Sequence, residues 1–142
     1  YVTTTAQQVL PSLLRYKRRM LWFLQPHHPH IGHPRLPAGI YTDVEKKIMN
    51  PQQRVTAMFK RAKRDGILPL TYAANLRLVL DEVERFIAWL KVRGLKGKVV
   101  ITSDHGEGLG EPYREGEKPV FSHPCGKEEY EVRVVPWVEA KL

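Results

Sequence analysis

The chain has 142 residues, of which 42% are hydrophobic and 27% are charged, and its formal net charge is +8. This length suits a single domain over residues 1–142 with a real hydrophobic core, and the composition excludes wholesale disorder. The positive charge favours anionic partners: phosphate or sulfate esters, nucleic acid, or an acidic membrane surface.

Two features bear on where the protein works. No apolar run approaches the roughly 20 residues of a membrane span, so we expect no spanning segment. The single cysteine, Cys125, cannot form an internal disulfide, and we expect a cytoplasmic protein. Because the chain begins with Tyr1 rather than methionine, we also expect a processed product or a piece of a longer protein.

The first 37 residues predict a helix, a strand and a loop. Apolar residues between Val9 and Leu14 recur at helical spacing, with Thr5 as the expected cap and Pro11 in the first turn. The run 20–24 is continuously apolar, as a buried parallel strand would be. Residues 27–37 hold four histidines, three prolines and a glycine, which predicts a loop.

The middle of the chain predicts helices. Residues 41–65 have helical character, and Pro51 suits the first position of a second piece. Residues 71–93 carry apolar side chains at i, i+3, i+4 and i+7, and Gly94 ends the pattern. This spacing predicts one long amphipathic helix.

The last third predicts two strands separated by loops. Residues 98–102 form a strand, residues 103–110 a polar glycine-containing turn, and residues 132–138 a last strand. The order of elements predicts the α/β class, with a small layered sheet, flanking helices and right-handed crossovers.

Residues able to bind metal follow two of the predicted strands. If 20–24 and 98–102 pair in parallel, the loops after them meet at one edge of the sheet, where α/β proteins bind ligands. Asp104 and His105 offer a carboxylate oxygen and an imidazole nitrogen. This mixture suits zinc, manganese or magnesium beside a phosphoryl or sulfuryl group.

The string Val-Val-Ile-Thr-Ser-Asp-His-Gly-Glu-Gly-Leu-Gly-Glu over residues 99–111 resembles the late metal-ligand motif of sulfatase-like and alkaline-phosphatase-like hydrolases. The resemblance implies that Asp104 and His105 bind a divalent metal: zinc, manganese, magnesium or calcium. It implies that His123, in Ser-His-Pro-Cys-Gly, contacts metal or substrate. Residues 130–136 resemble the glutamate, arginine, valine, proline strand of the family.

The upstream segment Phe-Leu-Gln-Pro-His-His-Pro over residues 23–29 resembles the family loop whose histidine contacts the anionic group of the substrate. His28 is the better match because Pro29 follows it directly, and His27 is the second. The resemblance implies the C-terminal part of the alkaline phosphatase-like fold and hydrolysis of phosphate or sulfate esters.

The chain departs from the family at its start. No segment resembles the family's nucleophile and early acidic metal ligand, since residues 3–5 lie too close to the predicted strand and no acidic residue precedes Asp43. The resemblance therefore implies a metal- and substrate-binding half that does not complete covalent transfer alone. Its expected partners are an N-terminal half or a second copy of the chain.

Several alternatives stay open. Asp104 and His105 could form an ordinary turn. Glu107 could accept a hydrogen bond from His105, or it could be a surface carboxylate near a helix start. His30 and His33 are expected to be solvated. The basic residues between 46 and 64 could bind nucleic acid, and a truncated, non-catalytic member could associate through exposed apolar surface.

Overall fold

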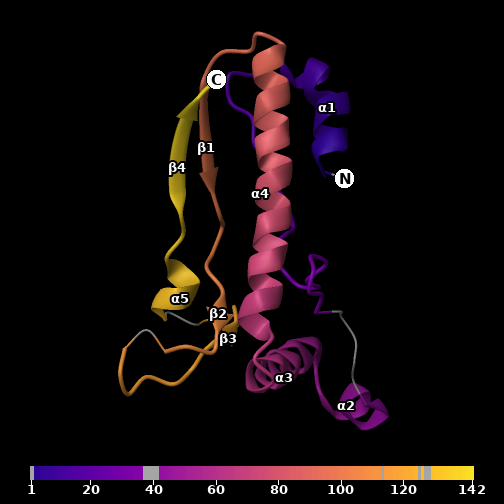
Figure 1. Cartoon of the computed structure of the whole chain (residues 1–142), viewed down its shortest axis with the longest axis vertical. Coiled ribbons are helices and arrows are strands. Elements are labelled where there is room, and N and C mark those ends of the chain that lie inside the picture. Colours follow the sequence, from indigo (N-terminus) through magenta and orange to yellow (C-terminus); the bar gives the residue numbers. More distant parts are fainter. Residues whose placement is uncertain (1, 37–41, 113, 125, 127–128) are drawn as a thin grey trace.

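The computed structural model describes residues 2–36, 42–112, 114–124, 126 and 129–142. Cys125 and the expected helix start at residue 41 lie outside these residues. The chain has a mixed α/β structure, as expected, with helices and small antiparallel sheets (Figure 1). In chain order the elements are α1 (Val2–Leu13), α2 (Asp43–Ile48), α3 (Pro51–Arg64), α4 (Leu68–Val92), β1 (Lys98–Thr102), β2 (Gly108–Leu109), β3 (Phe121–Ser122), α5 (Tyr130–Arg133) and β4 (Trp137–Lys141).

The long helix α4 is the axis of the molecule (Figure 1). Its 25 residues confirm the amphipathic helix predicted over 71–93. Ala6 and Leu10 of α1 pack against Phe86 and Leu90 of α4 and form one apolar cluster. At 1.5 Å per residue, α4 is roughly 37 Å long and connects the two ends of the molecule.

Helix α3 begins where Pro51 predicted. Asn50 caps it through a reciprocal pair of bonds with Gln53, both 2.9 Å long. Its apolar face supplies most of a second cluster, made of Leu36, Val55, Met58, Phe59, Ala62 and Leu68. This cluster lies beside the hairpin of β2 and β3, because Leu109 and Phe121 pack against it.

The predicted parallel sheet is wrong. Strand β1 pairs antiparallel with β4, with Ile101 opposite Val138. Residues 20–24 form no strand. Met20, Trp22 and Leu24 are 88%, 72% and 60% exposed, while Leu21 packs on the cluster between α1 and α4. The run is therefore an extended segment with one covered face, which continuous apolar character alone does not distinguish from a buried strand.

The predicted strand over 132–138 is also wrong in its bounds. Residues 130–133 form the single turn α5, held by a bond from the Val134 N–H to the Tyr130 carbonyl. Pro136 has no N–H to donate, and β4 begins directly after it. The N-terminal expectation needs correction too, because α1 starts at Val2: Thr5 lies inside it, and Pro11 lies near its end.

The molecule is open rather than compact. Its accessible surface is 10305 Å², whereas a compact monomer of 16.4 kDa exposes about 7,500 Å². Trp137 and Val138 of β4 contribute to this excess, being 65% and 51% exposed. No helix among the described residues is long and apolar enough to cross a membrane.

Candidate metal and substrate site

Histidines from three segments of the chain meet beside the N-terminal half of α4. The ring of His105, which follows β1, lies 4.0 Å from that of His123, which follows β3, measured between centroids. The His27 ring lies 5.1 Å from His123 and 4.3 Å from His28. The loops expected to share one place therefore do so, although the described strands pair antiparallel and not in a parallel sheet.

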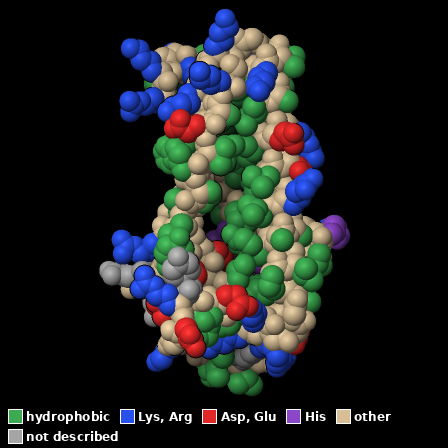
Figure 2. Space-filling model, turned by 60° about the vertical axis from the view of Figure 1, so that its left-hand side comes forward, with side chains coloured by type: hydrophobic (Ala, Val, Ile, Leu, Met, Phe, Trp, Pro, Cys, Tyr) green, Lys and Arg blue, Asp and Glu red, His purple; other side chains and the backbone are tan. Residues whose placement is uncertain are grey.

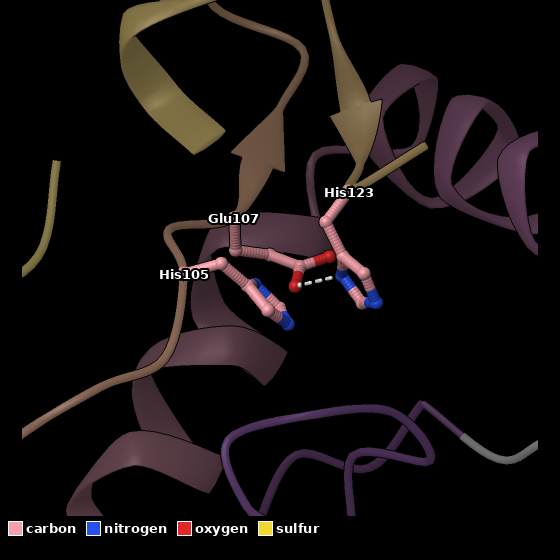
Figure 3. Close-up of side chains that lie close together, drawn as sticks. All are labelled: His105, Glu107 and His123. Carbon is pink, nitrogen blue, oxygen red and sulfur yellow. Dashed lines mark hydrogen bonds and ion pairs between the residues drawn. The ribbon is translucent and has the colours of Figure 1, made fainter. Parts of the chain in front are cut away.

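Two of these histidines and a nearby glutamate form a compact donor group (Figure 3). His105, Glu107 and His123 each offer one ligand atom, and these atoms all lie within 4.8 Å of one another. The side chain of Glu107 is only 9% exposed, and that of His123 is 23% exposed. Two imidazole nitrogens and one carboxylate oxygen are a common donor set for zinc with an open fourth position.

Hydrogen bonds fix which nitrogen of each ring is available. His105 Nδ1 donates to the Gly106 carbonyl at 2.7 Å, and His123 Nδ1 donates to Glu107 Oε2 at 2.8 Å. An imidazole that donates from Nδ1 and is neutral keeps its lone pair on Nε2. Histidines that bind metals usually have their second nitrogen held in this way by a carbonyl or carboxylate.

The hairpin of β2 and β3 sets the spacing of Glu107 and His123. Gly108 pairs with Ser122, so the next cross-strand positions are those of Glu107 and His123. A Cβ on Gly108 would lie 2.6 Å from the Val120 carbonyl oxygen, so only glycine lets the two strands approach this closely. From the sequence, Glu107 was a candidate hydrogen-bond acceptor for His105. In the structure it accepts from His123 instead.

Asp104 lies at the margin of this group. Its side chain is 57% exposed, and its Oδ1 accepts a bond from the His105 N–H at 3.1 Å. Oδ1 also lies 3.8 Å from His105 Nε2. The compact donor group therefore holds Glu107, while Asp104 adjoins it from the solvent side.

Two buried polar residues of α4 hold the histidine-rich loop in place. Asn75 is fully buried, and its Nδ2 donates to the carbonyls of Pro26 and His27 at 2.8 and 3.2 Å, while its Oδ1 accepts from the Ile31 N–H at 3.0 Å. Thr71, one turn earlier, bonds His30 Nδ1 at 2.9 Å. Gly32 completes the fit, because a Cβ there would lie 2.5 Å from the Ala74 carbonyl oxygen.

Sequence reasoning missed Asn75 and Thr71, although a signal existed. Both are polar and lie on the same face of the predicted helix as the apolar Val79, at i, i+4 and i+8. His30 was expected to be solvated, which is wrong: it is 1% exposed, because its ring packs against Phe59 and bonds Thr71. His33 is exposed, as expected.

Burial keeps the inner histidines neutral. Desolvation, followed by repulsion from His27 and His123, lowers the pKa of His28 to about 4. Burial likewise lowers the pKa of His30 to about 4. Within the described part of the chain, His28 Nδ1 is buried without a hydrogen-bond partner. Burial and the Glu107 carboxylate raise the pKa of Tyr72 to about 12, so this phenol stays protonated.

No family model, curated protein or solved structure matches the chain.

Proposed function

We propose that this chain is the metal- and substrate-binding part of a hydrolase of phosphate or sulfate esters, similar to the sulfatase-like and alkaline-phosphatase-like enzymes. The supporting observation is the meeting of the rings of His27, His28, His105 and His123, with the Glu107 carboxylate close to the last two. His27 and His28 lie about 75 to 95 positions before His105 and His123 in the sequence, and all four belong to the motifs that carry the resemblance.

The donor group fits a divalent metal. His105, Glu107 and His123 would hold it, and Asp104 lies at the margin, with its Oδ1 3.8 Å from His105 Nε2. A metal bound there would supply a Lewis acid that stabilises negative charge on the ester. Among zinc, manganese, magnesium and calcium, the two imidazoles favour zinc or manganese over calcium.

The residues of the chain itself have distinct tasks in this proposal. Glu107 positions the His123 ring by accepting its Nδ1–H, a hydrogen bond that it would give up on ligating the metal. His28 is neutral, because its pKa is about 4, and its ring lies 4.3 Å from that of His27, so the two rings would together meet the anionic group of the substrate. The formal charge of +8 favours such an anion.

The nucleophile is proposed to come from elsewhere, either from an N-terminal half or from a second copy of the chain. The open shape supports such a partner, because the accessible surface exceeds that of a compact monomer by about 2,800 Å², the area of a large interface. We place the assembled enzyme in the cytoplasm, in keeping with the single cysteine.

Elemental analysis tests the metal site directly. We expect about one zinc or manganese ion per chain after dialysis, lost in His105→Ala, Glu107→Ala and His123→Ala. His33→Ala is the matched control, because His33 is an exposed histidine of the same loop region and should keep the metal. Asp104→Ala shows which carboxylate binds the metal, Asp104 or Glu107. If this variant keeps the metal, Glu107 is the carboxylate ligand.

The proposal would be contradicted if the parent chain held no metal, or if His33→Ala lost as much metal as His123→Ala does.

The nucleic-acid alternative draws little support from α3 and its surroundings. There Lys46 pairs with Asp43, Lys63 with Glu111 and Arg64 with Asp65, so part of the positive charge is already balanced.

A further inference from the structure

The end of the molecule opposite the histidine cluster gathers positive charge. Six exposed side chains define this basic end: Lys17, Arg18, Arg19, Lys91, Arg93 and Lys96. Figure 2 shows Lys and Arg side chains crowded at the upper end of the molecule. The segments 13–20 and 91–98 that carry the six contain no Asp or Glu. The positive charge there is therefore not balanced by carboxylates of the same segments.

Contacts hold these two segments together as one surface. Arg19 donates from Nε to the Leu13 carbonyl at 2.8 Å and from Nη2 to the Leu14 carbonyl at 2.7 Å, which ties the segment after α1 to the end of that helix. Leu21 and Leu95 both pack on the apolar cluster between α1 and α4. Hydrogen bonds and apolar packing therefore fix the two basic segments relative to each other.

Apolar side chains project among these cations. Val92 is 85% exposed between Lys91 and Arg93, and Met20 is 88% exposed directly after Arg19. Trp22 follows two residues later and is 72% exposed. Single exposed apolar residues are ordinary, but aliphatic and indole side chains set among Lys and Arg are typical of surfaces that rest on lipid.

A groove opens at the same end between α1 and α4. Its volume is about 380 Å³, and its lining is mainly apolar, with Leu10, Leu14, Trp89 and Leu95. Arg93 also lines it, and its guanidinium lies 3.8 Å from the centre of the Trp89 ring. The groove therefore offers apolar walls and a fixed cation, which match the two parts of an anionic amphiphile.

We infer that the basic end is a docking surface for membranes that carry anionic lipids. Six cations suit a negatively charged leaflet, and the projecting Met20, Trp22 and Val92 suit the layer beneath the headgroups. A nucleic acid would use the cations but gain little from the aliphatic side chains. A second copy docked end to end would bring like charges together, which is unfavourable.

This docking surface is separate from the proposed metal site. Asn75, which holds the histidine-rich loop, and Arg93 are 18 positions apart in the sequence, or roughly 27 Å along α4. Either proposal can therefore fail while the other stands.

Co-sedimentation with lipid vesicles tests the inference. We expect the chain to bind vesicles of phosphatidylcholine mixed with phosphatidylserine and not vesicles of phosphatidylcholine alone. The triple variant Lys17→Gln, Arg18→Gln, Lys96→Gln should lower the partition coefficient on the order of 100-fold, since each basic residue near an anionic surface contributes about fivefold. The control Lys47→Gln, Arg114→Gln, Lys118→Gln removes the same charge from exposed positions away from the basic end and should bind like the parent.

A second variant tests the apolar part. Val92→Asn replaces the apolar side chain at an 85% exposed position with an uncharged polar one, so it should leave the far-ultraviolet circular dichroism unchanged while weakening binding to the mixed vesicles. Equal losses in both triple variants would overturn the inference, as would equal binding to neutral vesicles. RNA binding without vesicle binding would assign the surface to nucleic acid, and self-association without vesicle binding would assign it to a second copy.

Discussion

Asn75→Ala should loosen the histidine-rich loop and destabilise the whole chain. Asn75 is fully buried and makes three hydrogen bonds to the loop, two from its Nδ2 and one to its Oδ1. At about 1 kcal/mol for each bond, the variant should lose about 3 kcal/mol of the free energy of unfolding. For a urea m value of about 2 kcal/mol per molar, the midpoint should fall by about 1.5 M.

Urea unfolding followed by far-ultraviolet circular dichroism measures this loss. Arg77→Ala is the matched control: it is an alanine substitution two residues later on an exposed side chain, whose pair with Asp81 should contribute less than about 1 kcal/mol. If Asn75→Ala and Arg77→Ala lose the same free energy of unfolding, Asn75 does not hold the loop. The account of how α4 positions His27 and His28 would then be refuted.

Two further predictions concern pH and the metal-ligand turn. Folding lowers the pKa of His30 from 6.5 to about 4. The free energy of unfolding should therefore be greatest above about pH 6.5 and decline as the pH falls toward 4, by at most about 3 kcal/mol. Urea midpoints measured across this range should decline less steeply for His30→Gln. A Cβ on Gly106 would overlap the Glu131 carbonyl oxygen, so Gly106→Ala should abolish metal retention in elemental analysis while Gly116→Ala, with open space around it, keeps the metal. Retention by Gly106→Ala would mean that the turn does not depend on its contact with α5.

Local patterns predicted the elements that are set by local forces. The amphipathic spacing that predicted residues 71–93 is observed as α4, Pro51 starts α3, and residues 98–102 form β1. The strand over 20–24 could not be predicted correctly, because a five-residue apolar run does not reveal whether a partner strand is present. Its supposed partner β1 pairs instead with β4, near the other end of the sequence.

The candidate site was predictable to the extent that its residues form motifs. His27, His28, His105, Glu107 and His123 were singled out from the sequence, and they lie together. Their supports were not predicted, since Asn75 and Thr71 lie more than 40 positions from the loop that they bond. The contact of Glu107 with His123 depends on the β2 and β3 register, which no local pattern encodes.

The single long helix α4 acts as a spacer of fixed length. An uninterrupted helix resists bending, so whatever surface the chain rests on at Arg93 stays roughly 27 Å from the loop held at Asn75. This separation would suit esters that project from such a surface better than esters buried within it.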